Sequence, residues 1–469
     1  MNLKNIFKLL SGNILAQLIT ILFIPIITRL FSPADFGQYT LFIAILGFFG
    51  VISCLRYEIA ISIPERKQDA IHLVVGGSYI LIGMVLISSI IVTFAGFLFP
   101  LEIGKLGLTT NLKYIPLGLL LLGTYNLLSY YALREKNYSI VAQTKVAQVS
   151  FISLSQILFH NFGAKALILG YVIGQTIGSI SLFRKFRKDL LVTKISFKRI
   201  KELLIEYKNF PLYSTWGAML NNLGQSVPII LFSLFFGTKI AGLYALSYRL
   251  LVVPLGTVSS AVSSYFFSIA REQIANKKID ITIFQIISIL SKLSFPFFLL
   301  LLFLNKDIYI LIFGDKWGEV ATFVKILVPW LGCVFVISPI SMFMEILEHQ
   351  GENLIFQIIL FMSRALAITY GLFNKDIIFV LSLFSAVSVL CWVALLMRIL
   401  VLSQLKIGCV LLEFFKNLLI SLILLLPLIF YSLDFFPGNY FFYLIITLFF
   451  ILCYYVWILK GMRKSENVG

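Results

Sequence analysis

Residues 71–98 read IHLVVGGSYILIGMVLISSIIVTFAGFL, a run that contains no Asp, Glu, Lys or Arg. An α-helix rises about 1.5 Å per residue, so about 20 apolar residues cross the hydrocarbon core of a bilayer, which is about 30 Å thick. Backbone polar groups in lipid must be satisfied internally, and a helix does this within one segment. The run therefore predicts a transmembrane helix.

Similar runs recur from the first residues to the last. Of the 469 residues, 60% are hydrophobic and only 13% are charged, whereas soluble domains usually have about 25% charged residues. The composition predicts an all-α polytopic membrane protein with about 14 transmembrane helices and leaves no room for an extramembrane catalytic domain. The expected spans are 7–30, 37–55, 71–98, 114–133, 140–159, 164–183, 210–236, 241–269, 281–304, 321–344, 354–373, 377–399, 411–433 and 440–459.

The net charge of +17 would suggest nucleic-acid binding in a soluble protein. Here most Lys and Arg residues lie in short loops between the apolar spans, where basic residues set the orientation of a membrane protein because they stay on the cytoplasmic side. With a cytoplasmic N-terminus, 24 of them fall on the cytoplasmic side and 8 on the other. We therefore predict that both termini are cytoplasmic and expect no nucleic-acid partner. The first apolar stretch lacks a small-residue cleavage site, so we interpret it as a retained helix.

Motifs for metal, nucleotide or nucleophilic chemistry are absent from the sequence. The five cysteines form no CxxC pair, the three histidines are far apart, and there is no P-loop and no GxGxxG. We expect no catalytic residue, no metal site, no cofactor and no enzyme activity.

A basic segment divides the chain. Residues 184–208 carry nine bases and three acids, with an apolar residue every three or four positions, which is typical of an amphipathic helix at a membrane surface. It follows the sixth span and suggests a hinge. The predicted organisation is a six-helix lobe at 1–183, a basic amphipathic cytoplasmic linker at 184–209, a second six-helix lobe at 210–400, and two accessory helices with a basic tail at 401–469.

An internal repeat supports two lobes. RLFSPADFGQYTL at 29–41 and LFFGTKIAGLYAL at 234–246 match with a shift of 205 residues. The shift places Gly37 on Gly242 and Tyr39 on Tyr244. Six spans per half give a parallel repeat, in which both halves enter the membrane from the same side.

The first helix of each predicted lobe carries a polar stripe. Asn13 and Gln17 lie on one face of the first span, and Asn222 and Gln225 lie on one face of the seventh. Such stripes either form hydrogen bonds between helices or line a water-filled cavity. Their presence in both halves favours a central cavity.

Bases inside or near the ends of the spans outnumber acids, and no Asp or Glu lies near the middle of a predicted span. Buried positive charge favours an anionic passenger, because Arg and Lys both bind phosphate oxygens. The alternative is that each base reaches the headgroups or pairs with backbone carbonyls. The candidate cationic residues are Arg29, Arg56, Lys145, Arg249, Lys292, Lys325 and Arg364.

Three stretches resemble a known family: TRLFSPADFGQYTLFIAILGFF (28–49), LRYEIAISIPERKQDAIHL (55–73) and AGLYALSYRLLVVP (241–254). They resemble bacterial polysaccharide-biosynthesis membrane proteins, the O-antigen unit flippases of the multidrug/oligosaccharidyl-lipid/polysaccharide exporter superfamily. The resemblance implies two lobes that alternate between inward-open and outward-open states around a cationic cavity, with two extra helices for a polyprenyl tail.

The implied passenger is an undecaprenyl-diphosphate oligosaccharide, an O-antigen or capsule repeat unit moved from the cytoplasmic to the periplasmic leaflet of the inner membrane. The resemblance also implies coupling to a proton or sodium gradient, contact with membrane lipid, and partners among polysaccharide polymerases and glycosyltransferases. Three alternatives stay open: a flippase for another lipid-linked precursor, a multidrug antiporter of the same superfamily, and a membrane glycosyltransferase or polymerase.

Overall fold

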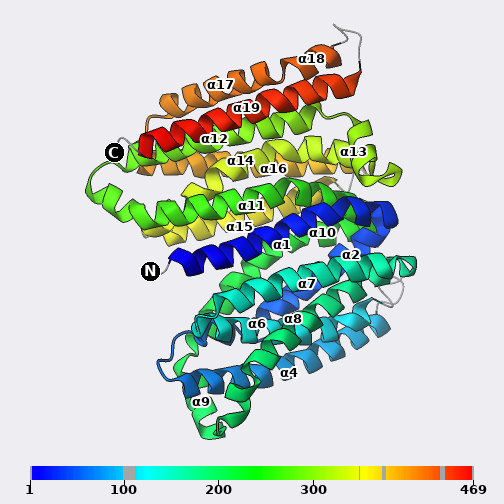
Figure 1. The fold of residues 1–469 in the computed structure, drawn as a ribbon, viewed down its shortest axis with the longest axis vertical. Helices are drawn as coiled ribbons and strands as arrows, with labels where there is room; N and C mark the ends of the chain where they lie inside the picture. Colours follow the sequence, from blue (N-terminus) through cyan, green and yellow to red (C-terminus); the bar gives the residue numbers. More distant parts are fainter. Residues whose placement is uncertain (1–2, 99–110, 348, 372–375, 434–438, 467–469) are drawn as a thin grey trace. The chain divides into compact units, whose positions relative to one another are not determined.

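The computed structural model describes residues 3–98, 111–347, 349–371, 376–433 and 439–466, which form helices and no strands (Figure 1). The helices up to residue 236 are α1 (Leu3–Leu30), α2 (Pro33–Ile52), α3 (Tyr57–Ala60), α4 (Lys67–Leu98), η1 (Leu112–Tyr114), α6 (Ile115–Arg134), α7 (Tyr138–Leu158), η2 (His160–Phe162), α8 (Ala164–Val192), α9 (Phe197–Glu206), η3 (Phe210–Ser214) and α10 (Thr215–Phe236). Those after it are α11 (Thr238–Ala275), α12 (Ile279–Phe303), α13 (Lys306–Phe313), η4 (Asp315–Trp317), α14 (Val320–Ile346), α15 (Gln350–Gly371), α16 (Ile377–Leu402), α17 (Ile407–Leu424), α18 (Leu426–Ser432) and α19 (Tyr440–Glu466).

Twelve helices in the described ranges are long and apolar enough to cross a membrane. Two further helices, α7 with 21 residues and α11 with 38, coincide with the predicted fifth and eighth spans and carry more polar side chains. Each predicted span is helical over most of its described residues, and the predicted fold class is confirmed. The span predicted at 411–433 is divided between α17 and α18, and residues 372–373 of the span predicted at 354–373 lie outside the described residues. Many large apolar side chains on these helices are exposed, as expected of surfaces that face lipid.

The chain packs as two units. The first consists of residues 1–246 and 309–318, and the second of residues 247–308 and 319–469. The division falls inside α11, whereas the lobes inferred from the repeat divide at 184–209. Packing explains the difference, because α10 lies against α2 in the first unit, where the side chain of Asn222 contacts Gly47.

The repeated motif of the first unit forms a tight corner between α1 and α2. Ser32 is the N-cap of α2 and exchanges hydrogen bonds with Asp35, a capping box that satisfies two backbone donors. Pro33 follows in the first turn, where its missing N–H costs nothing. The other oxygen of Asp35 accepts from the backbone N–H of Ala164, at 3.0 Å, and so fixes the start of α8.

Two repeat-related glycines meet where α2 crosses the start of α11. A Cβ on Gly37 would lie 1.8 Å from the carbonyl oxygen of Thr238, and a Cβ on Gly242 would lie 1.9 Å from that of Pro33. The shift of 205 residues also relates Pro33 to Thr238, so the crossing is reciprocal. Only glycine allows the two backbones to approach so closely. The structure therefore gives a physical reason for the glycines in the sequence repeat.

The basic segment folds as two helices rather than one. α8 continues to Val192, and α9 begins after the N-cap Ser196. Ile200 and Leu203 of α9 are buried, while Arg199 forms a bidentate ion pair with Asp69 of α4, with both N–H···O distances at 2.9 Å. The amphipathic helix predicted for this segment is thus restricted to Phe197–Glu206.

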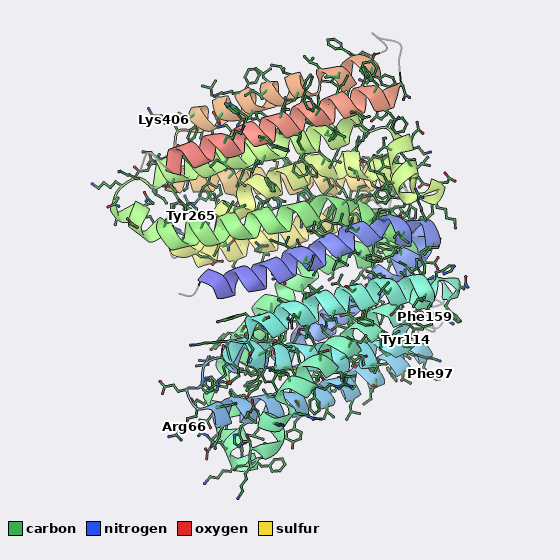
Figure 2. All side chains as sticks on the ribbon, viewed as in Figure 1. Arg66, Phe97, Tyr114, Phe159, Tyr265 and Lys406 are labelled. Carbon is green, nitrogen blue, oxygen red and sulfur yellow. The ribbon has the colours of Figure 1, made fainter. Side chains whose placement is uncertain are left out.

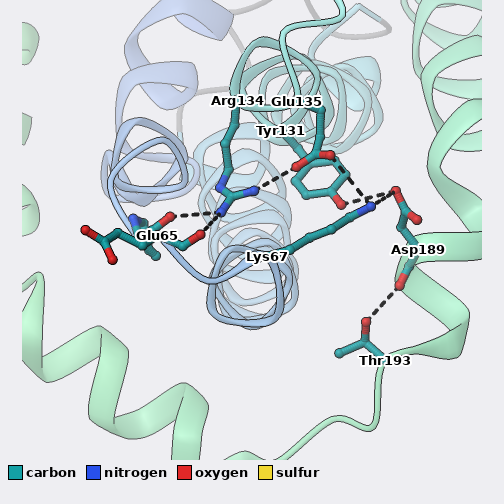
Figure 3. Close-up of polar contacts among 8 residues, drawn as sticks. Glu65, Lys67, Tyr131, Arg134, Glu135, Asp189 and Thr193 are labelled. Atoms are coloured by element: carbon teal, nitrogen blue, oxygen red, sulfur yellow. Dashed lines mark hydrogen bonds and ion pairs between the residues drawn. The ribbon is translucent and has the colours of Figure 1, made fainter.

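Polar contacts join α4, α6 and α8 at one end of the first unit (Figure 3). The Nζ of Lys67 lies 2.9 Å from Asp189 and 3.6 Å from Glu135, and Arg134 bonds the adjacent Glu135 at 2.7 Å. In Figure 2, Arg66 lies at this end of the unit, and the labelled aromatic residues Phe97, Tyr114 and Phe159 lie at the opposite end. The charged ends and the aromatic ends of these helices are therefore separated.

The last three helices pack on α12 in the second unit. Tyr440 and Leu425 belong to a buried apolar cluster with Leu300, and the Tyr455 hydroxyl donates to the carbonyl of Leu293 at 2.8 Å. The other faces of α17 and α19 carry exposed Leu, Ile and Phe side chains.

Candidate functional site

Arg364, from the middle of α15, is the embedded base with the most elaborate setting. Its Nε donates to the hydroxyl of Ser388 on α16, at 2.8 Å. Its guanidinium carbon lies 4.5 Å from the ring centre of Trp330 and 5.3 Å from that of Phe384. Cation–π contacts at these distances stabilise a guanidinium.

The rings around Arg364 are themselves fixed. Trp330 is only 4% exposed, packs edge-to-face on Phe384 with ring centres 5.2 Å apart, and stacks with Tyr248 at 5.9 Å. Ser388 is fully buried and donates to the carbonyl of Phe384. Four helices of the second unit thus supply the setting. Rigid neighbours keep the guanidinium in one orientation, which favours binding a ligand without further ordering.

Lys292, in α12, has an anionic partner that the sequence did not reveal. Its Nζ lies 3.4 Å from Oε1 of Glu413 in α17. The same oxygen accepts hydrogen bonds from Ser288, at 2.5 Å, and from Asn417, at 3.3 Å. Asn417 also donates to Ser291 at 2.8 Å. The network joins the first accessory helix to α12 and compensates the positive charge of Lys292.

Arg56 lies in the tight connection between α2 and α4. Its Nη1 is 3.9 Å from Oε1 of Glu58, the limit for an ion pair. The Glu58 side chain is buried, and burial raises the pKa of its carboxyl above the usual range, opposed by a backbone hydrogen bond and by the charge of Arg56. Burial also raises the pKa of the Cys54 thiol to about 12, so Cys54 remains protonated at neutral pH.

The other candidate bases are placed differently. Arg29 ends α1 and donates from Nη2 to the carbonyl of Leu311 at 2.6 Å, while Trp317 donates to the carbonyl of Thr28. Lys145 in α7 and Lys325 in α14 are exposed. Arg249 is half-buried in α11 and belongs, like Lys292, Lys325 and Arg364, to the second unit. Arg29, Arg56 and Lys145 belong to the first.

The polar stripes both lie in the first unit. Asn13 is exposed and Gln17 is half-buried on α1. On α10, Gln225 is exposed and its amide donates to Asn221, and Asn222 accepts from Ser226, both at 3.3 Å. Gly217 and Gly224 on α10 have no heavy atom within 4 Å of an added Cβ. Part of α10 near the stripe is therefore open.

Glu58, Glu413 and the rings around Arg364 were missed by the sequence analysis. The aromatic content of each span gives no sign of which ring faces which base, and Glu413 lies more than a hundred residues from Lys292 in the chain. Within the described ranges, no cluster of three or more His, Cys, Asp or Glu side chains could hold a metal ion. Arginine side chains of this kind can bind an anion, and carboxyl groups can bind a proton.

Comparison with known proteins gives a family match and a common fold. Residues 26–322 match the family model described as "Polysaccharide biosynthesis protein". The chain is 22% identical over 310 residues to the lipopolysaccharide biosynthesis protein WzxC of Escherichia coli, covering 64% of this chain and 61% of that one. It is 25% identical over 189 residues to the teichuronic acid biosynthesis protein TuaB of Bacillus subtilis, covering 36% of this chain and 38% of that one.

Among solved structures, the lipid II flippase MurJ in an inward closed conformation superposes with a TM-score of 0.71. The superposition covers 99% of this chain and 100% of that chain at 18% sequence identity. A likeness at this identity shows a common fold. The alignments to WzxC and TuaB span less than two thirds of those proteins.

Proposed function

The chain belongs to the family of polysaccharide biosynthesis proteins, and from that premise we propose that it moves a lipid-linked saccharide across the membrane. The passenger is an undecaprenyl-diphosphate oligosaccharide, an O-antigen or capsule repeat unit. Transport proceeds from the cytoplasmic to the periplasmic leaflet by alternating access. The names of WzxC and TuaB, which refer to lipopolysaccharide and to teichuronic acid, support a saccharide passenger.

The physical problem is the diphosphate and its glycan. An unpaired charge in hydrocarbon is prohibitively costly, so neither group crosses a bilayer unaided. Fixed cations in the protein replace the hydration of the phosphates, while the polyprenyl tail stays in lipid. The two states of the transporter must bind the passenger with different affinity, because equal affinity in both would drive no change of state.

Arg364 is the observation that carries this proposal. It lies in the middle of an apolar helix, and two aromatic rings and a hydroxyl hold its guanidinium in place. A planar guanidinium binds phosphate oxygens through two parallel N–H···O bonds. We assign Arg364 as the principal diphosphate-binding residue. Arg56, Arg249, Lys145 and Lys325 are further contributors, and Asn13, Gln17, Asn222 and Gln225 are candidate contacts for the glycan.

Lys292 and Arg29 are given other roles. The charge of Lys292 is compensated by Glu413, and Arg29 donates to the carbonyl of Leu311 at the end of α13. Neither is therefore proposed to bind the passenger. The ion pair between Lys292 and Glu413 argues against a multidrug cation antiporter. Such a transporter needs an embedded carboxylate to attract a cation, and the carboxylate of Glu413 is already bound by Lys292, Ser288 and Asn417.

The remaining expectations belong to the same proposal. We place the chain in the bacterial inner membrane with both termini in the cytoplasm, which the bias of Lys and Arg toward one side supports. The exposed faces of α17 and α19 suit contact with the polyprenyl tail. Polymerases and glycosyltransferases that make and extend the saccharide are the expected partners.

Reconstitution tests the proposal. The purified protein and a labelled undecaprenyl-diphosphate oligosaccharide are incorporated into liposomes. An impermeant enzyme is then added that cleaves only the glycan in the outer leaflet, so that cleavage over time measures translocation. The expected result is translocation above that of protein-free liposomes, which changes when a proton or sodium gradient is imposed. Equal translocation with and without the protein would overturn the proposal.

A further inference from the structure

The connection between α2 and α4 holds a buried acid and a base in a strained turn. Leu55 and Arg56 both have positive φ angles, 49° and 64°. Non-glycine residues in the left-handed region are strained, and two in succession persist only where the surroundings enforce them. Tyr57 is buried next to them, and its hydroxyl donates to the carbonyl of Leu204 in α9 at 2.7 Å.

Glu58 is buried with one of its two carboxyl oxygens unbonded. The residue is 5% exposed, and its Oε2 is buried with no hydrogen-bond partner in the described part of the chain. The Nε of Arg56 is also buried and has no hydrogen-bond partner in the described part of the chain. A charged guanidinium–carboxylate bond is usually 2.7–2.9 Å long and often bidentate. The single separation of 3.9 Å is instead what a neutral carboxyl beside an arginine would show.

In the described part of the chain, Arg56 is the charged group that forms an ion pair with Glu58. Cys54, the second group that interacts electrostatically with the carboxyl, is a buried neutral thiol. The helices with the most contacts to α3 are α4, α6 and η3, and the hydroxyl of Tyr57 also bonds α9. The ionisable groups of these helices at this end either have partners elsewhere or are exposed. Lys67 pairs with Asp189, Asp69 with Arg199, His72 with the Ser196 amide and Arg134 with Glu135. The exposed groups are Lys198, Lys201, Glu202, Glu206 and Tyr213.

We propose that Glu58 is a proton-binding site that sets the charge Arg56 offers to an anion. With the proton on Glu58, the guanidinium is uncompensated and binds a phosphate group. When the proton leaves, the carboxylate pairs with Arg56 and the phosphate is bound more weakly. Proton and anion therefore bind together, and by linkage each strengthens the binding of the other by the same factor.

The inference rests on the proposed function, because it takes the anion to be the diphosphate of the passenger. It adds a titrating residue to a transporter whose predicted spans contain no acid near the middle. Glu58 itself binds the proton, and the anion that Arg56 binds belongs to the class of polyprenyl diphosphates. Because burial disfavours the charged carboxylate, the neutral form persists to higher pH than in an exposed glutamate.

Binding of farnesyl diphosphate to the purified full-length protein tests the linkage. Dissociation constants are measured from pH 5.5 to 8.5 for the wild type, Glu58→Gln and Glu65→Gln, the last being an exposed acid of the same connection. Titration of the diphosphate itself affects all three alike. We expect Glu58→Gln and the wild type to bind equally at low pH and Glu58→Gln to bind about tenfold more tightly at high pH, as a difference of about 1.4 kcal/mol gives. Glu65→Gln should follow the wild type.

A ratio between wild type and Glu58→Gln that does not change with pH would overturn the inference. Infrared spectroscopy of the ligand-free protein in D2O provides a second readout. A band of a protonated carboxyl should be present at pH 6, absent in Glu58→Gln and retained in Glu65→Gln. Absence of that difference would overturn the proton site and leave the proposed function intact. If none of the three proteins bound farnesyl diphosphate, the proposed function would fail, and the infrared band would still decide whether Glu58 holds a proton.

Discussion

Lys292 and Arg364 look alike in the sequence, because each is a single base within an apolar helix of the second unit. Their surroundings differ. Lys292 faces the carboxylate of Glu413 at 3.4 Å, whereas Arg364 is held by Trp330, Phe384 and a hydroxyl. The ion pair with Glu413 joins Lys292 to a neighbouring helix, whereas the two rings and the hydroxyl hold the guanidinium of Arg364 in one orientation. The partner, rather than the presence of the charge, decides the role of an embedded base.

The largest expected effect is on transport by Arg364→Ala. Loss of a charge-assisted hydrogen bond costs about 1.5–3 kcal/mol, which corresponds to a transport rate about 10–100-fold lower. Arg364→Lys keeps the positive charge but loses the planar guanidinium that can form two parallel bonds to a phosphate, so an intermediate rate is expected. The rate is measured in proteoliposomes at equal protein content. An unchanged rate in Arg364→Ala would remove Arg364 from the binding site.

Next in size is the loss of stability in Glu413→Ala. The change leaves the charge of Lys292, whose side chain is 30% exposed, without its carboxylate, and leaves Ser288 and Asn417 without their acceptor. Unpaired polar groups of this kind cost about 1–3 kcal/mol. Unfolding in detergent should show the loss. Lys292→Met combined with Glu413→Leu should recover most of the lost stability, because replacing both members of a buried ion pair with apolar side chains often leaves the stability unchanged. A double variant as unstable as Glu413→Ala would contradict the pairing.

A smaller effect is expected on the pH dependence of stability, where Glu58 contrasts with the well-bonded Glu413. The folded state raises the pKa of Glu58, so its contribution to stability is present at low pH and is lost as the pH rises through the folded-state pKa. As the pH is raised from 5 to 8, the melting temperature of the wild type should fall more steeply than that of Glu58→Gln. Parallel curves for the two proteins would show that Glu58 ionises as freely as an exposed acid.

The smallest effect is on transport by the double variant Lys292→Met with Glu413→Leu. If the pair serves only to join α12 and α17, the rate should stay within about twofold of the wild type, a difference of less than about 0.5 kcal/mol. The variant is the matched control for Arg364→Ala, since it also removes an embedded base from the same unit. A loss as large as that of Arg364→Ala would mean that Lys292 binds the passenger.

The helices were predictable from the sequence because length and apolar composition are local properties. The fourteen predicted spans are helical over most of their described residues, with the one at 411–433 divided between α17 and α18. The repeat also predicted the equivalence of Gly37 and Gly242, which are in mutual contact. The helix α8 continues to Val192, through residues that the sequence analysis assigned to the basic linker. Charged residues can continue a helix beyond the bilayer, so charge alone does not mark its end.

The surroundings of the bases were not predictable, because they depend on contacts between distant segments. Lys292 and Glu413 lie on α12 and α17, and Arg364 meets a ring from α14 and another from α16. Glu58 lies in the stretch YEIAISI, whose apolar neighbours were the only sign that the acid would be buried. Sequence reasoning could list the embedded bases, and only packing could separate them.

The most direct test of the account is a side-by-side transport measurement of the two bases. Translocation of labelled undecaprenyl-diphosphate oligosaccharide is compared in proteoliposomes that contain the wild type, Arg364→Ala, or Lys292→Met with Glu413→Leu. The account predicts that Arg364→Ala loses at least about tenfold in rate while the double variant stays close to the wild type. Equal rates in all three, or a loss confined to the double variant, would contradict it.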